Sequence, residues 1–417
     1  MPSPRPERLL PLPLPSGLTD RQIDSPASEL SFHIIEAGSK GDPLILLLHG
    51  FPELAFSWRK VMPGLAQAGF YTVAVDQRGY GRTTGWDTRQ FEDVDLRTFS
   101  VTNLIRDIVV LVHALGYSQA NCLVGHGFGA VAAALCTLTR PDLFRKVILM
   151  SHPFEGLPAP PVDVSSSKSS TEPKPKPDIH WELASLLEPR KHYKMYYSTA
   201  AANADMCSKE GLYDFFRGYF HLKSADWHGN KPHPLNSMTA TELAEIPYYY
   251  IMPLMCDMRE VISECMNTED PAIVHERSSR WLPDSELVVY VSEYGRTGFQ
   301  GGLNWYRVQT DSKILRDLDM LAGKKIEVPC LFIAGKKDWS IYQEPGVLEH
   351  MSDVCNEFHG VVLIDGAGHW VQQEQPAKVS QEIVKFARCS PCHWVTDSDA
   401  NMRTPITSDL LYKPPAT

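Results

Sequence analysis

A tight turn between an apolar strand and a helix is the first place where this chain could carry a reactive side chain. The stretch CLVGHGFGA, residues 122–130, has glycine at positions 125, 127 and 129. In a turn of the pattern small-x-nucleophile-x-small, the central side chain stands exposed at the helix N-terminus, and its close neighbours must be glycine. The central residue here is Gly127, which has no side chain. Three glycines in five residues also suit a plain tight strand–helix turn, but the pattern favours a catalytic turn whose nucleophile position is vacant.

Two later residues have the types that acid–base chemistry requires. Asp338 follows the apolar run VPCLFIAG, and His369 follows GVVLIDGAG. An imidazole acts as a general base when a carboxylate orients it and stabilises its cation. We expect an oxyanion hole near the turn, formed by the backbone N–H groups of Phe51 (in HGFPE) and Phe128.

No other side chain near the turn replaces the missing nucleophile. The side chains of His126 and Phe128 leave the turn in other directions, Cys122 lies in a buried strand, and Ser151 ends a different strand. Glycine adopts the strained backbone of such a turn without a Cβ clash. The fold itself therefore favours Gly127 once covalent chemistry is no longer required.

Apolar strands alternate with helical segments on both sides of the turn, which predicts a mostly parallel sheet covered by helices. The pattern breaks at residue 155 and resumes near residue 318. The predicted organisation is a proline-rich, loosely packed N-terminal arm (1–29), a core (30–154), a helical cap (155–317) with a flexible loop (158–177), a second core part (318–390) and a C-terminal tail (391–417). A cap inserted there covers the carboxyl edge of the sheet, where such folds bind ligands.

Composition excludes several classes of partner. The 417 residues carry a net charge of −10, which leaves no basic surface for nucleic acid. No apolar run reaches the roughly 20 residues of a membrane helix. Nine scattered cysteines are typical of reduced thiols in a cytoplasmic protein. Cys389 and Cys392 form a lone C-x-x-C without further ligands at metal spacing, so we expect no metal and no cofactor. The oligomeric state stays open.

Several longer stretches resemble the epoxide hydrolases of the α/β-hydrolase superfamily, which are close to the haloalkane dehalogenases. The resemblance covers residues 30–388 and rests on HGFPELAFSWR, DQRGYG, the turn, GFQGGLNWYR, GKKDW and GAGHWVQQEQP. The cap stretch HYKMYYSTAAANADM is similar to the fungal and bacterial branch. The resemblance implies an α/β-hydrolase fold: a mostly parallel twisted sheet, helices on both faces and an inserted helical cap.

The resemblance also implies roles for individual residues. In that family an aspartate of the turn, called the nucleophile elbow, attacks an epoxide carbon, two cap tyrosines donate hydrogen bonds to the epoxide oxygen, and a His–Asp pair activates water to cleave the ester. Asp338 and His369 match the pair, and Tyr306 of NWYR matches one tyrosine. Tyr193 matches the second, with Tyr196 as the alternative. All three tyrosines could instead be core aromatics.

Three hypotheses for function follow, because the family's aspartate is replaced by Gly127. In the first, the chain is an epoxide-hydrolase-like protein that acts on a hydrophobic small molecule and has lost covalent turnover. Alternatively, it is a non-covalent acid–base enzyme that opens, cyclises or isomerises an epoxide, for example in secondary metabolism. The third hypothesis is a pseudoenzyme that binds a small molecule without turnover.

Overall fold

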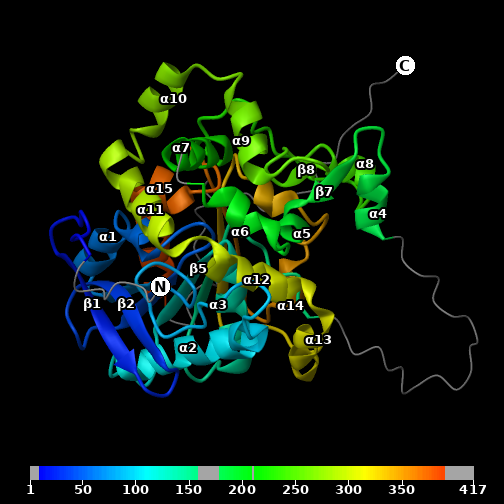
Figure 1. The fold of residues 1–417 in the computed structure, drawn as a ribbon. Coiled ribbons are helices and arrows are strands. Elements are labelled where there is room, and N and C mark those ends of the chain that lie inside the picture. The colour runs from blue at the N-terminus through cyan, green and yellow to red at the C-terminus, as the bar shows by residue number, and fades with distance from the viewer. Residues whose placement is uncertain (1–8, 158–177, 209–210, 390–417) are drawn as a thin grey trace, which may run out of the picture.

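An eight-stranded sheet runs through the core of the chain. Figure 1 shows where its strands β1, β2 and β5 lie among the helices. The structure is a computed structural model and describes residues 9–157, 178–208 and 211–389. The strands follow the order β1-β2-β4-β3-β5-β6-β9-β10. Their bounds are β1 Leu18–Ser25, β2 Leu30–Ala37, β3 Leu44–Leu48, β4 Tyr71–Val75, β5 Cys122–His126, β6 Val147–Met150, β9 Cys330–Gly335 and β10 Phe358–Ile364. From β4 to β10 all neighbouring strands are parallel, whereas β1 and β2 are antiparallel to their neighbours.

Helices enclose this sheet because its central strands are apolar on both faces. Every residue of β3, β4, β5 and β6 is buried, as expected for parallel strands covered on both sides. The covering helices are α1 (Met62–Gln67), α2 (Val101–Ala114), α3 (Phe128–Thr139) and α16 (Pro376–Arg388), with α1 against α16 and α2 against α3. The chain also forms η2 (Ala55–Trp58), η3 (Leu96–Phe99), η5 (Trp339–Tyr342), α14 (Met351–Val354) and α15 (Val371–Glu374).

The N-terminal segment differs from the predicted loosely packed arm. Residues 18–25 form β1, which pairs along its whole length with β2 at the edge of the sheet. Only Leu18 and Ile23 are large apolar side chains there, so the sequence carries a weak strand signal. The backbone ladder and an ion pair from Arg21 Nε to Glu36 Oε1, 2.9 Å long, hold this edge instead.

Between β6 and β9 the chain leaves the sheet and builds the layer drawn in green and yellow, which in Figure 1 extends from the top of the molecule to its lower right. Its elements are α4 (Ile179–Ala184), β7 (Arg190–His192), α5 (Tyr193–Tyr197), α6 (Ala201–Met206), α7 (Leu212–Lys223), α8 (Ala240–Leu243), β8 (Ile251–Pro253), α9 (Met258–Met266), α10 (Pro271–Ser278), α11 (Asp284–Thr297), α12 (Gln300–Thr310), α13 (Ser312–Leu315) and η4 (Arg316–Leu321). The predicted cap, 155–317, falls within this stretch. It is not purely helical, because β7 and β8 pair in an antiparallel ribbon. The predicted loop 158–177 and tail 391–417 lie outside the described residues.

Close backbone packing joins this layer to the core at the start of α12. A Cβ added to Gly301 would overlap the carbonyl oxygen of Gly79, and Gly79 itself has a φ of +90°. Next to this contact, Trp305 Nε1 donates to the carbonyl oxygen of Arg78 at 2.9 Å. These contacts fix α12, and with it Tyr306, over the sheet.

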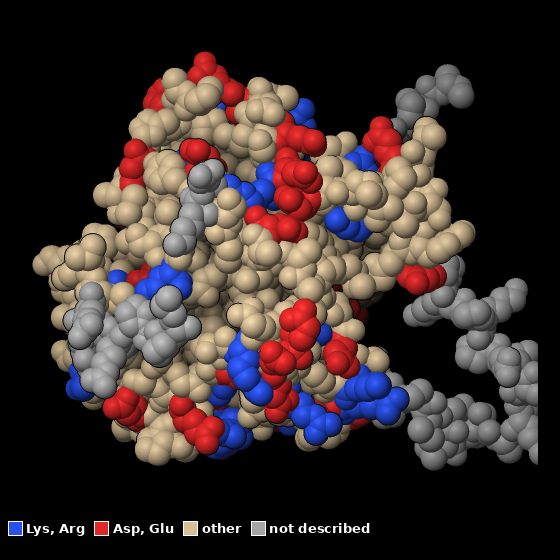
Figure 2. Space-filling model, in the orientation of Figure 1, with Lys and Arg blue, Asp and Glu red and all other residues tan. Residues whose placement is uncertain are grey.

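Charged side chains of both signs are interspersed on the face of the molecule shown in Figure 2. Within the described residues, no helix combines the length and apolar character needed to cross a membrane.

Candidate active site

The elbow between β5 and α3 is a backbone-to-backbone contact, and glycine is required on either side of its centre. A Cβ on Gly125 would overlap the carbonyl oxygen of Gly129, and a Cβ on Gly129 would lie 2.5 Å from that of Leu48. Gly127 differs, because the nearest atom to its added Cβ is the Cα of Gly50 at 3.6 Å. Its φ of +55° and ψ of −119° are a backbone conformation that is strained for any residue with a side chain. Space therefore permits a side chain at Gly127, at the cost of backbone strain.

The vacant position faces His369. An added Cβ at Gly127 would lie 3.8 Å from His369 Nε2. On the other side of the ring, Nδ1 lies 3.2 Å from both carboxylate oxygens of Asp338. Asp338 is buried and also accepts the N–H of Ser340 at 2.9 Å. The structure thus brings three of the sequence-predicted site residues next to one another, with the imidazole of His369 between Gly127 and the carboxylate of Asp338.

Electrostatics keep this pair as a neutral imidazole beside a carboxylate. Burial lowers the pKa of His369 below its ordinary value of 6.5, although Asp338 opposes that shift. Burial would raise the pKa of Asp338, but the charge and hydrogen bond of His369 outweigh it and the pKa is lowered. Since Asp338 can only accept, Nδ1 carries the proton and Nε2 is free to accept one.

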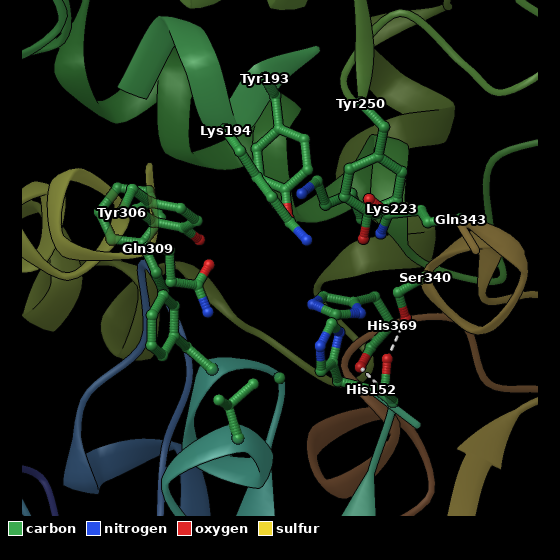
Figure 3. Close-up of a pocket in the computed structure, with 15 residues that line it drawn as sticks. His152, Tyr193, Lys194, Lys223, Tyr250, Tyr306, Gln309, Ser340, Gln343 and His369 are labelled. Atoms are coloured by element: carbon green, nitrogen blue, oxygen red, sulfur yellow. Dashed lines mark hydrogen bonds between the residues drawn. The ribbon is translucent and has the colours of Figure 1, made fainter. Parts of the chain in front are cut away.

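Two tyrosines reach the pocket from the cap, opposite His369 (Figure 3). Tyr193 begins α5 and Tyr306 lies in α12, with ring centroids 5.9 Å apart. Burial raises the pKa of both phenols, so they remain protonated donors. Tyr196 instead donates to Asp205 Oδ2 at 3.0 Å and is not among the residues that line the pocket.

Phe51 and Phe128 lie on the core side of the same pocket. Their rings meet the Tyr306 ring edge-on, at centroid distances of 5.5 and 5.3 Å. Within the described residues, no hydrogen bond uses the backbone N–H of either phenylalanine. Both N–H groups therefore have no protein acceptor, as an oxyanion hole requires.

A buried ion pair lies beneath the elbow. His126 Nδ1 is 2.6 Å from Glu53 Oε2, and His126 Nε2 is 2.7 Å from the carbonyl oxygen of His369. Burial would raise the pKa of Glu53, but the positive charge of His126 outweighs it and lowers the pKa to about 2. Gln372 also donates to this carboxylate at 2.8 Å. His126 thus supports the backbone that carries His369 and does not itself face the pocket.

Several pocket residues have no signal in the sequence analysis. The space beside Gly127 is a cavity of about 40 Å³, next to a larger one of about 480 Å³. The two share the lining residues Val131, His152, Lys194 and Gln309. Lys223 and Tyr250 line the small cavity as well. Only the folded chain brings these residues together, since they come from separate elements.

No metal site accompanies this pocket in the part of the chain that the structure describes, where no group of three or more His, Cys, Asp or Glu is placed to hold an ion. Cys389 is described, but Cys392, its predicted C-x-x-C partner, lies outside the described residues.

Comparisons with known proteins place this geometry in a family. Residues 43–178 match the α/β-hydrolase fold model. Epoxide hydrolase A of Mycobacterium tuberculosis is 31% identical over 369 residues, which span 88% of this chain and 97% of the relative. The chain belongs to the epoxide-hydrolase-like α/β hydrolases. An epoxide hydrolase of Caballeronia sordidicola is 28% identical over 88% of this chain and 94% of its own.

Solved structures of epoxide-hydrolase-like α/β hydrolases show the same fold. Epoxide hydrolase A from Mycobacterium thermoresistibile superimposes with a TM-score of 0.65 at 29% identity, covering 88% of this chain and 98% of its own. Potato epoxide hydrolase I gives a TM-score of 0.63 at 26% identity, with the same two coverages.

The steric difference between the elbow glycines predicts a difference in stability. Gly125→Ala should lower the free energy of unfolding by more than about 4 kcal/mol, because the new Cβ meets backbone that cannot move aside. Gly127→Ala should cost only about 1–3 kcal/mol, because it adds strain without overlap. Urea unfolding of both variants measures the two values. Equal losses would contradict this reading of the elbow.

Proposed function

We propose that this chain opens an epoxide on a hydrophobic small molecule by acid–base catalysis, without an ester to the enzyme. One observation carries the proposal: the space where an elbow side chain would stand is open and faces His369 Nε2, whose orienting Asp338 is in place. The site keeps a base and two acids but lacks the covalent nucleophile.

The base acts on a nucleophile that is not part of the protein. A water molecule, or a hydroxyl of the substrate itself, fits beside Gly127 within hydrogen-bond reach of His369 Nε2. As its oxygen bonds to an epoxide carbon, the C–O bond of the epoxide breaks and His369 takes the proton of the nucleophile. The epoxide oxygen takes a proton from Tyr193 or Tyr306, and the proton on His369 returns to that tyrosine through solvent. Attack by water yields a diol, and attack by a hydroxyl within the substrate yields a cyclic ether.

The acids stabilise the leaving oxygen. Tyr193 and Tyr306 donate hydrogen bonds to the epoxide oxygen, and their raised pKa values keep the protons available up to alkaline pH. The hydroxyl of Tyr306 makes no hydrogen bond within the described residues, so it is free to donate to a ligand. The N–H groups of Phe51 and Phe128 support negative charge that develops beside the elbow.

A hydrophobic substrate is favoured by the walls of the larger cavity. Its lining includes the apolar side chains Val101, Leu135, Phe154, Leu315 and Leu318. The relatives' names, epoxide hydrolase in each case, favour an epoxide as the reacting group. The bulk of the molecule would occupy this cavity while its epoxide reaches the smaller one.

A single-turnover reaction in ¹⁸O-water tests the route. With a panel of hydrophobic epoxides, we expect ¹⁸O in the diol from the first turnover and none in the elbow peptide. Tyr306→Phe and His369→Ala should each slow turnover by about 10²–10⁴-fold, because each removes one acid–base group. Product and peptide masses are read by mass spectrometry.

Tyr196→Phe is the matched control, because that hydroxyl serves Asp205 outside the pocket. A covalent adduct on the elbow peptide, or full activity in both active-site variants, would contradict the proposal. Tight binding of epoxides without any turnover would contradict it too and favour a pseudoenzyme.

A carboxylate placed at position 127 tests whether the rest of the pocket still supports covalent epoxide hydrolysis. Gly127→Asp should create covalent epoxide hydrolysis, because the new side chain starts 3.8 Å from His369 Nε2. It should also lower the free energy of unfolding by about 1–3 kcal/mol through backbone strain. Repeated turnover in ¹⁸O-water should place the label in the Asp side chain.

Gly127→Asn is the control, since it adds a similar volume without a carboxylate. A folded Gly127→Asp variant that forms no ester with any epoxide in a broad panel would mean that the pocket no longer accepts an epoxide at the elbow.

A further inference from the structure

Lys223, whose side chain ends in an amine, lies in the wall of the small cavity. It is the last residue of α7 and is 3% exposed. Its side-chain nitrogen lies 4.2 Å from the ring centroid of Tyr250 and 4.5 Å from that of Tyr219. The rings of Tyr249 and Tyr193 follow at 5.3 and 5.7 Å. Four aromatic rings therefore surround this amine at the edge of the pocket.

The amine of Lys223 makes few polar contacts. Lys223 Nζ donates one hydrogen bond, to the hydroxyl of Tyr219 at 2.9 Å. Within the described residues, no carboxylate lies within the 4.0 Å of an ion pair to it. An ammonium ion buried without a carboxylate is costly, and the amine lowers that cost by losing its proton.

Lys194 lines the same cavity in a different state, which gives an internal comparison. Its Nζ lies 3.5 Å from Glu344 Oε1. Burial would lower the pKa of Lys194, but Tyr193 and Glu344 outweigh it and the pKa is raised. At neutral pH this side chain is a cation and not a nucleophile.

Charges around Lys223 offset the effect of burial on its pKa only in part. Burial lowers its pKa to about 7, and the distant Asp338 opposes this only in part. His369 is the other titratable core residue nearby, and the positive charge of Lys223 contributes to lowering its pKa. The remaining groups that face the amine are the four tyrosines, whose pKa values are all raised by burial. The free amine of Lys223 is therefore accessible near neutral pH.

We propose that Lys223 is a carbonyl-binding site, where its amine forms a Schiff base with hydrophobic aldehydes and ketones that enter the pocket. The nitrogen adds to the carbonyl carbon, and the carbonyl oxygen takes a proton to give a carbinolamine. The nitrogen gives one of its two hydrogens back to the group that supplied this proton. The hydroxyl then leaves as water with the other hydrogen, and the C=N bond of the imine forms. Tyr193 and Tyr250 both lie close to the amine and are protonated, so they can supply the proton.

The size of the pocket favours this chemistry. An epoxide and the carbonyl compound formed by its isomerisation have the same atoms, so a pocket that admits one admits the other. The carbon chain would occupy the cavity of about 480 Å³, which adjoins the small one at Lys194 and Gln309. This activity does not depend on epoxide opening.

Reductive trapping tests the proposal. The full chain is incubated at pH 7 with 4-phenylbutanal or 4-phenylbutan-2-one and sodium cyanoborohydride, and peptides are mapped by mass spectrometry. We expect the stable secondary amine on Lys223, formed at least about tenfold faster than on Lys194. The initial rate should rise between pH 6 and 8 and then level off, following the fraction of free amine.

Variants separate a specific site from general lysine modification. Lys223→Arg should abolish the pocket adduct and Lys194→Arg should leave it, and circular dichroism checks both folds. Should Lys223→Arg fail to fold, the peptide map of the unaltered chain still decides. His369→Ala and Tyr306→Phe should retain the adduct, so failure of the epoxide proposal would not remove it. Adducts confined to exposed lysines, or equal rates at Lys223 and Lys194, would overturn the inference.

Discussion

At the elbow, the backbone of Gly129 packs so closely against β3 that an added Cβ would lie 2.5 Å from the carbonyl oxygen of Leu48. The carboxyl ends of β3 and β5 therefore meet at one point. Gly50 also comes within reach of the elbow, since a Cβ on it would lie 2.9 Å from the carbonyl oxygen of His126. This contact brings the loop that carries Phe51 beside position 127, so the glycines shape the pocket as well as the turn.

Two further contacts hold the other groups around this point. The Glu53–His126 pair bonds the carbonyl oxygen of His369 from below, which ties the base to the elbow. Removing one partner of such a buried pair usually costs about 3–5 kcal/mol, because the other charge stays unpaired. Above the pocket, the backbone contact of Gly79 with Gly301 fixes the helix that carries Tyr306. His369 and Tyr306 thus line the space beside Gly127 from the core and from the cap.

The loss of the elbow side chain does not require collapse of the site. Gly125 and Gly129 must be glycine because the backbone packs against them, whereas at Gly127 only the strained φ and ψ disfavour a side chain. Glycine relieves that strain and leaves the neighbours where they are. The open space, the neutral imidazole and the protonated tyrosines are therefore present together, and this combination supports the acid–base proposal.

The parts of the site that the sequence predicts are those that follow local signals. The α/β-hydrolase fold, the elbow and the ends of β9 and β10 appear as apolar runs followed by Gly, Asp or His, so Asp338 and His369 could be placed before the structure. Tyr193 and Tyr196 are the same residue type and lie three positions apart in α5, so only the direction of each side chain separates them.

Other features depend on contacts between distant segments. Lys223 meets the pocket because the end of α7 packs against residue 369, whose N–H donates to the Lys223 carbonyl oxygen at 2.8 Å. Nothing near Lys223 in the sequence indicates that neighbour. Strand β1 was not predicted for a different reason. An edge strand with two large buried apolar side chains depends on its backbone hydrogen bonds, which leave no pattern in the sequence.

A crystal structure with a bound hydrophobic oxetane, a slowly reacting ring analogue of an epoxide, tests the central claim most directly. The account predicts the ring oxygen within about 3 Å of the hydroxyls of Tyr193 and Tyr306. It also predicts an ordered water beside Gly127 within about 3 Å of His369 Nε2. A ligand that binds elsewhere, or one that fills the space beside Gly127 with apolar atoms and leaves His369 without a water or hydroxyl, would contradict it.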